Sequence, residues 1–244
     1  MVFLKRIVAV CGVRREGVAN MKRTPLKERV LPDYTRGEEV ANMVTHIVGG
    51  ALGILACVLC PIIGARHHDA YAVVSGSIYA FSLLVLYAIS SVYHGLSPNL
   101  MGKKVMQVID HCTIYLLIAG SYTPFTLCTI RRFSPGWGWA LFGVVWALAA
   151  LGASLTAVDL KKYSRFSMLC YILMGWCILV RIDLVYRLLG PGGFTLLLTG
   201  GIAYTAGAVL YGLGKKKRYM HAAFHVSTLI GSLLQFLCVI FYVL

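Results

Sequence analysis

The polar residues of this chain that could do chemistry stand at the ends of otherwise apolar segments. Ser90 and His94 close one such segment, Asp110 opens another, and His221 and His225 open the last. Polar groups of this kind are costly inside a membrane and need a reason. Residues four apart on a helix point the same way, so His221 and His225 can share one metal ion. A third imidazole, from His94, would complete the three-ligand protein shell of a catalytic zinc site.

The composition assigns the chain to the integral membrane proteins. Apolar residues make up 59% of the 244 residues and charged residues 13%, and the mean hydropathy is +0.76. A water-soluble domain could not cover so much apolar surface. A bilayer core about 30 Å thick takes about 20 residues per helix. We therefore expect an all-α membrane domain over 34–244, a bundle of seven transmembrane helices at about 43–64, 70–94, 108–130, 137–156, 166–189, 193–213 and 221–243.

The basic residues predict the orientation of this bundle. Most of the 23 lysines and arginines fall in the N-terminal arm and in the loops that share its side. The positive-inside rule then predicts a cytoplasmic N-terminus and an extracytoplasmic C-terminus. Residues 1–33 are expected to form a basic, disordered cytoplasmic arm. The net charge of +14 is explained by topology and by attraction to anionic lipids, and nothing else in the sequence supports nucleic-acid binding.

This orientation brings the candidate residues to one depth. His94 ends its helix on the cytoplasmic side, and Asp110, His221 and His225 begin theirs there. Ser90 lies four residues before His94, on the same face and about 5.4 Å deeper. The alternative is that these histidines only hydrogen-bond to lipid headgroups or water.

A zinc centre suits this set of side chains. Three neutral imidazoles, from His94, His221 and His225, would bind the ion and leave a fourth position for water. Bound zinc lowers the pKa of such a water and polarises a carbonyl. Asp110 is the candidate general base, and Ser90 is a candidate donor to the water, to Asp110 or to an oxyanion.

Four ordered motifs give the chain a resemblance to a known family. They are Glu39-x-x-Asn42-x-x-Thr45-His46, Ser90-Ser91-Val92-Tyr93-His94, Asp110-His111-x-x-Ile114 running into Ile118-Ala119-Gly120-Ser121-Tyr122-Thr123-Pro124-Phe125, and His221-x-x-Phe224-His225. Over about residues 34 to 244 the chain resembles the haemolysin III branch of the progestin and adipoQ receptor family. The resemblance implies seven helices with a cytoplasmic N-terminus in a bacterial plasma membrane. It also implies zinc on His94, His221 and His225, with Ser90 and Asp110 beside the bound water.

The function has three readings. Through the adiponectin receptors and alkaline ceramidases, the wider superfamily is similar to metal-dependent hydrolases of lipid amides, which favours a zinc hydrolase acting on an amide or ester bond of a membrane lipid. The second reading is a non-enzymatic receptor, lipid-homeostasis or transport accessory protein with structural zinc. The third is a pore-forming cytolysin, which the lack of a continuous polar stripe disfavours. The sequence names no protein partner.

Several further residues have both a functional and a structural reading. Glu39 and His46 are site-adjacent groups or headgroup contacts, and His111 is a partner of the site or a packing residue. Family members often carry a histidine where this chain has Gln235, which lies roughly 15 Å along the helix from His225 and is too far to bind the same ion. Pro124 should kink or locally open its helix.

Overall fold

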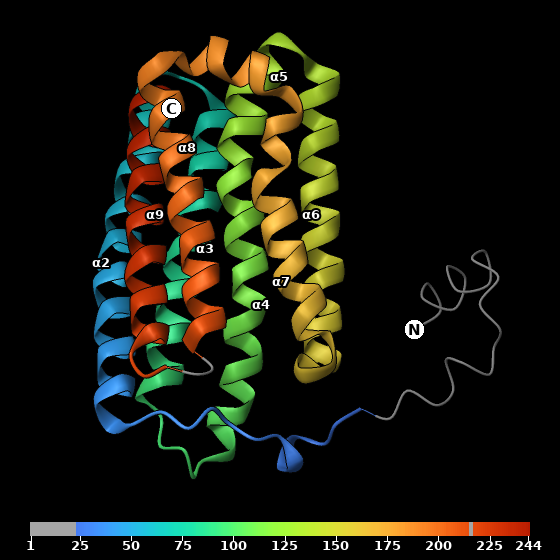
Figure 1. The fold of residues 1–244 in the computed structure, drawn as a ribbon. Coiled ribbons are helices and arrows are strands. Elements are labelled where there is room, and N and C mark those ends of the chain that lie inside the picture. The colour runs from blue at the N-terminus through green and yellow to red at the C-terminus, as the bar shows by residue number, and fades with distance from the viewer. Residues whose placement is uncertain (1–22, 215–216) are drawn as a thin grey trace, which may run out of the picture.

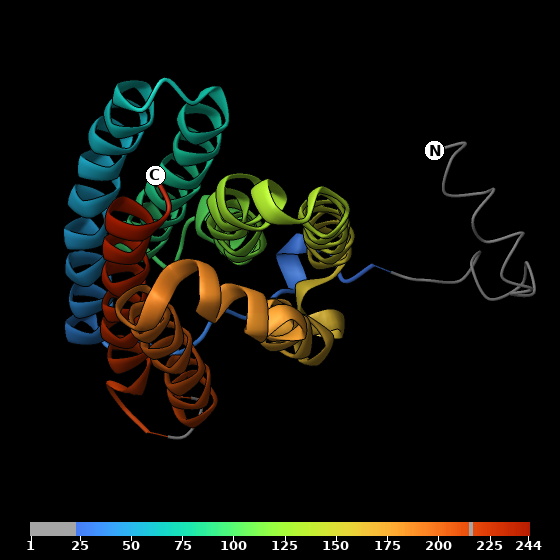
Figure 2. The same ribbon diagram turned by 90° about the horizontal axis from the view of Figure 1, so that it is seen from above.

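The computed structural model describes residues 23–214 and 217–244, and the regular elements within these ranges are helical. Long helices lie side by side along a common axis (Figure 1), and the view along that axis shows them packed as a bundle (Figure 2). They are α2 (Arg36–Arg66), α3 (Ala70–Gly95), α4 (Met101–Pro124), α6 (Pro135–Val158), α7 (Leu160–Trp176), α8 (Ile182–Gly214) and α9 (Met220–Tyr242). The shorter elements are η2 (Leu26–Glu28), η3 (Phe125–Ile130), α5 (Arg131–Phe133) and η4 (Cys177–Arg181).

The bundle has the properties of a multi-pass membrane protein. Six helical stretches of the described residues are long and apolar enough to cross a membrane. Large apolar side chains face outward from them, including Phe81 at 60% exposure, Leu173 at 61% and Phe241 at 71%. Such a surface suits a lipid environment, where outward apolar groups carry no cost. The expected integral membrane class is therefore confirmed.

The longest of these stretches, Leu160–Gly214, contains a break. Gly190 has φ of 63° and ψ of 178°, a backbone conformation that glycine adopts at little cost. Pro191 follows it and cannot donate a backbone hydrogen bond. Figure 1 shows the ribbon leaving α7, crossing one end of the bundle and returning along it as the later part of α8. The break falls between the two helices expected at 166–189 and 193–213.

The starts of α2 and α7 differ from the expected ranges because capping residues, and not apolar runs, determine them. α2 begins at Arg36, not near 43, because Thr35 and Glu38 form a reciprocal capping box that satisfies free backbone donors at the first turn. α7 begins at Leu160, not near 166, because the Asp159 carboxylate accepts from the Lys162 backbone N–H at 3.0 Å. Hydropathy alone does not detect such polar first turns.

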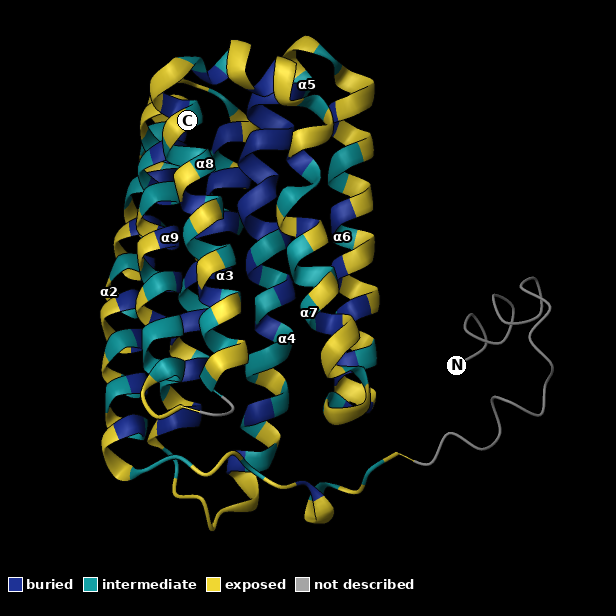
Figure 3. Cartoon of the chain, in the orientation of Figure 1, coloured by how far each residue is buried: buried dark blue, intermediate teal, exposed yellow. Residues whose placement is uncertain are grey.

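The centre of the bundle is α4 with its extension η3. In the apolar part of Met101–Phe133, 83% of residues are buried, and Figure 3 shows the dark, buried colour concentrated there. The expected opening at Pro124 is confirmed, because the α-helix changes into the wider π-helix η3 after this proline. Gly120 permits a close approach to α3, since a Cβ there would lie 2.1 Å from Ser82 Oγ.

The described part of the N-terminal arm runs across the end of the bundle at which α2, α4 and α9 begin (Figure 1). Thr24 donates its backbone N–H and its hydroxyl to Asp159 Oδ2, at 2.9 and 2.7 Å. Lys104 Nζ donates to the Lys27 carbonyl at 2.8 Å. Residues 1–22 of the expected disordered arm lie outside the described residues, whereas residues 23–35 contact the bundle at these points.

Candidate metal centre

Three histidines from two helices meet at this end of the bundle. His94 lies in the last turn of α3, and His221 and His225 lie in the first two turns of α9. Each offers a ring nitrogen, and the three atoms lie within 4.8 Å of one another. His225 Nε2 and His221 Nε2 are 2.8 Å apart. The predicted convergence of the three imidazoles is therefore present, with the four-residue spacing of the α9 pair acting as expected.

The donor set fits a transition-metal ion. An ion with four tetrahedral bonds of about 2.0–2.1 Å holds its ligand atoms about 3.4 Å apart, so small side-chain adjustments suffice here. His94 Nε2 is buried, and among the described residues it has no hydrogen-bonding partner. Burial of an unpaired imidazole nitrogen is unfavourable, and a metal ion would satisfy this atom. A three-imidazole site also suits the borderline-soft divalent metals.

Ser90 and Asp110 lie beside the histidines. Ser90 is buried on α3, one turn before His94, and its side chain lies close to the Asp110 carboxylate of α4. Both side chains line the same cavity as His221 and His225. The structure thus brings together all five residues of the predicted site, from α3, α4 and α9.

Helix α2 contacts two of these imidazoles at Nδ1, the ring nitrogen that does not face the other histidines of the cluster. Glu39 Oε2 accepts from His94 Nδ1 at 2.6 Å, and His46 Nε2 pairs with His225 Nδ1. Glu39 and His46 are seven residues apart, which is close to two helical turns, so both face α3 and α9. The sequence left open whether Glu39 and His46 lie beside the site or contact lipid headgroups, and in the structure they lie beside the site.

An aromatic side chain of the arm lies against the cluster. The Tyr34 ring stacks on the His221 imidazole, with centroids 5.0 Å apart and planes 22° apart. It lies 6.1 Å from the His94 ring. Burial and the neighbouring acidic side chains raise the pKa of the Tyr34 phenol, so it stays neutral at physiological pH. Residues before α2 therefore form part of the wall around the histidines.

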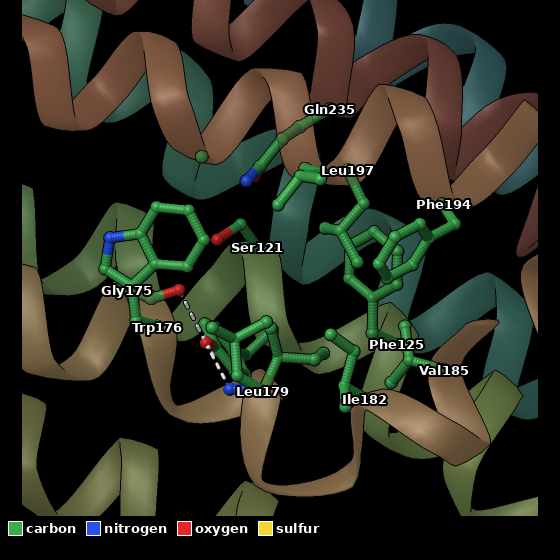
Figure 4. A pocket seen from close by; sticks show the side chains of 14 residues that line it. Ser121, Phe125, Gly175, Trp176, Leu179, Ile182, Val185, Phe194, Leu197 and Gln235 are labelled. Carbon is green, nitrogen blue, oxygen red and sulfur yellow. Dashed lines mark hydrogen bonds between the residues drawn. The ribbon is translucent and has the colours of Figure 1, made fainter.

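A cavity of about 180 Å³ extends from the histidines into the bundle. Its walls are largely apolar, with Leu86, Ile114, Met168 and Ile172 among the lining residues. At its inner end it reaches Gln235, which also lines an adjoining cavity of about 30 Å³. Figure 4 shows Ser121, Trp176 and Gln235 facing one another where these cavities meet. The polar centre thus stands at one end of an elongated apolar space.

Other sequence expectations have mixed outcomes. His111 lines the cavity, and its Nδ1 donates to the Gln107 carbonyl at 2.8 Å within its own helix. Asp183, in the first turn of α8, pairs with Arg181 at 3.3 Å. Lys103 is one of the basic residues from which the orientation is predicted, and nothing in the sequence marks it further, yet its side chain is buried beside Glu39.

The apolar helical bundle and its three-histidine cluster define a multi-pass membrane protein with a candidate metal centre. The family model described as Haemolysin-III related matches residues 34–236, and the chain belongs to this family.

Curated relatives agree with this assignment. The chain is 42% identical to Hemolysin-3 of Bacillus cereus over 207 residues, covering 85% of this chain and 92% of the relative. It is 37% identical to the Hemolysin-3 homolog of Bacillus subtilis (strain 168) over 209 residues, or 86% and 96% of the two chains. The human monocyte to macrophage differentiation factor is 26% identical over 211 residues, 84% of this chain and 83% of that protein. The two Bacillus relatives point to a bacterial plasma membrane.

Proposed function

We propose that the protein is a zinc-dependent membrane hydrolase that cleaves an amide or ester bond in a lipid. The observation that carries this proposal is the placement of three converging imidazoles beside the Ser90–Asp110 pair, at the end of an apolar cavity. Family membership alone does not fix an activity. The chemistry of these side chains, and not the family, therefore supports a hydrolase.

The residues divide into holding and reacting groups. His94, His221 and His225 would hold the zinc ion, which when bound supplies a Lewis acid and a readily deprotonated water. A carboxylate oxygen of Asp110 accepts a proton from the attacking water, and Asp110 then gives this proton to the leaving amine or alcohol. Ser90 lies beside Asp110 and would help to hold its carboxylate in place. Its hydroxyl lines the same cavity as His221 and His225 and would donate to an oxygen of the reacting carbonyl.

The substrate class follows from the cavity. Its apolar walls would exclude water and hold a hydrocarbon chain, while the polar centre receives the headgroup end with the scissile bond. Gln235 stands farther along the space, and its Oε1 is buried with no hydrogen-bonding partner among the described residues. A hydroxyl or amide N–H on the chain of the lipid would satisfy this oxygen.

We further propose that the chain crosses the membrane seven times, with the N-terminus in the cytoplasm. The break at Gly190 divides Leu160–Gly214 into an outgoing and a returning crossing. The end of the bundle that holds the histidines also carries exposed basic residues, among them Lys161, Lys162 and Arg218. The positive-inside rule assigns that end to the cytoplasm, so the reaction would take place near the inner membrane face.

The test is a lipid-hydrolysis panel on purified protein in lipid nanodiscs, with amide-linked and ester-linked substrates. Asp110→Asn keeps the shape of the side chain and removes its basicity, so it should retain zinc and lose at least 100-fold in turnover. Asp183→Asn is the matched control, since Asp183 pairs with Arg181 away from the histidines and should leave turnover unchanged.

Absence of lipid hydrolysis would change the interpretation of the metal centre. Parent protein that binds zinc stoichiometrically and hydrolyses none of these lipids would contradict the hydrolase. It would favour a non-enzymatic membrane protein in which the same histidines hold a structural ion.

A further inference from the structure

Glu39 on α2 divides its two carboxylate oxygens between a histidine and a lysine. Oε2 lies 2.6 Å from His94 Nδ1, and Oε1 lies 2.6 Å from Lys103 Nζ. The lysine comes from the first turn of α4 and also donates to the Leu96 carbonyl at 2.8 Å. Three helical segments, the starts of α2 and α4 and the end of α3, are therefore joined through one carboxylate.

Lys103 is unusual in being 1% exposed. Lysine is almost never fully buried unless its charge is paired, and a buried ion pair is costly to desolvate. Its neighbour on the chain, Lys104, extends to the surface of the arm instead. Positive charge for topology needs only the exposed position, so the burial of Lys103 points to a local role beside Glu39.

The contact with Glu39 determines which nitrogen of His94 is free. An ionised carboxylate only accepts hydrogen bonds, so Nδ1 must carry the proton and Nε2 must present its lone pair. Nε2 is the buried atom with no partner among the described residues. Asn42 Nδ2 lies 3.4 Å from the same Nδ1 and cannot donate to a nitrogen that is itself protonated. The carboxylate, and not the amide, sets the tautomer.

We propose that Glu39 and Lys103 are positioning residues of the metal centre. Glu39 fixes the tautomer and orientation of His94 and makes its ring a stronger ligand, and Lys103 holds Glu39 in place and balances its charge. Carboxylates on the outer nitrogen of a ligating histidine act in this way, and their loss typically lowers metal affinity 10- to 100-fold. The inference rests on the metal site of the proposed function and is independent of hydrolysis.

The experiment measures zinc affinity of the full-length protein in detergent, by competition with a chromogenic chelator. Glu39→Gln should weaken zinc binding about 10- to 100-fold. Glu38→Gln is the matched control on the preceding residue, because Glu38 caps α2 and contacts the Tyr219 backbone N–H, so its loss should affect folding without affecting zinc affinity. Lys103→Met should lower the affinity in the parent and have little further effect in the Glu39→Gln background, because it acts through Glu39.

A second readout separates positioning from general destabilisation. The thermal midpoint of the metal-free protein is recorded for each variant, and Lys103→Arg serves as a charge-conserving variant that should retain part of the affinity. Parent-like zinc affinity in Glu39→Gln, or equal losses in Glu39→Gln and Glu38→Gln, would overturn the proposal. Parent protein that binds no zinc would overturn both this proposal and the metal site. Protein that binds zinc with the expected Glu39 dependence but hydrolyses no lipid would leave this proposal standing and remove only the hydrolase.

Discussion

Replacement of Asp159 by asparagine should release the N-terminal arm from the bundle while leaving α7 intact. Each carboxylate oxygen of Asp159 accepts hydrogen bonds from a different segment. Oδ2 accepts from the backbone N–H and hydroxyl of Thr24, and Oδ1 accepts from the Lys162 N–H at the start of α7. Asparagine is nearly as good an N-cap as aspartate, so its side-chain oxygen can still accept from the Lys162 N–H. Its NH2 group would then face the Thr24 N–H, which is also a donor.

The expected size of the effect follows from these contacts. Hydrogen bonds to a charged group contribute about 1.5–3 kcal/mol each when buried. These two share one oxygen at a partly solvated site, so we expect a combined loss of about 2–3 kcal/mol for the variant. Since 1.4 kcal/mol corresponds to a factor of ten, the docked arm should become roughly 30- to 150-fold less favoured.

The pH dependence has a definite sign. Burial alone raises the pKa of the Asp159 carboxyl, but hydrogen bonds from the Lys162 N–H and Thr24 outweigh burial and lower the pKa from 3.8 to about 2. A depressed pKa means that the ionised carboxylate stabilises the docked state. This stabilisation is complete above about pH 4 and is lost as the pH falls through about 2.

Hydrogen exchange measured by mass spectrometry on peptides spanning residues 23–34 tests this prediction. The variant should exchange faster in that segment by the factor given above, and Asp183→Asn should match the parent. Unchanged protection in Asp159→Asn would refute the reasoning, as would parent protein that loses protection between pH 7 and 5.

Two further predictions concern the packing that holds the site. Gly120→Ala should destabilise the bundle by about 1–3 kcal/mol. The new Cβ would lie 2.1 Å from Ser82 Oγ and 2.6 Å from Ser82 Cβ, and rotation of the serine side chain cannot relieve the second clash. A thermal midpoint equal to that of the parent would contradict the α3–α4 contact. Tyr87→Phe should lower the free energy of unfolding by about 1 kcal/mol, since it removes the 2.7 Å hydrogen bond to Ser232 while Ser232 keeps its hydrogen bond to Tyr204. A loss above about 3 kcal/mol, measured by denaturant unfolding, would contradict this estimate.

Much of the metal centre could be predicted from the sequence, because its geometry is mainly helical geometry. The four-residue spacing of His221 and His225 fixes their common face, and the apolar runs place His94 and Asp110 at the same bundle end. The fold class follows from composition for the same reason. These features depend only on the period of a helix and the thickness of a membrane.

The contacts of α2 with the site could not be predicted in this way. Whether Glu39 and His46 reach a histidine or a headgroup depends on which helices pack together, and no sequence period determines that. Lys103 was misjudged because one lysine has the same positive charge whether it is buried or exposed. The Thr35–Glu38 capping box was a readable signal, and it would have given the correct start of α2.

The central claim is that His94, His221 and His225 hold one zinc ion together. The most direct measurement is the metal content of protein purified without chelators, compared with that of His225→Ala, by plasma mass spectrometry. The account predicts one zinc ion per parent chain and less than about a tenth of that in the variant, because two imidazoles bind zinc far more weakly than three. Parent protein without bound metal, or a His225→Ala variant that retains its full zinc content, would contradict it.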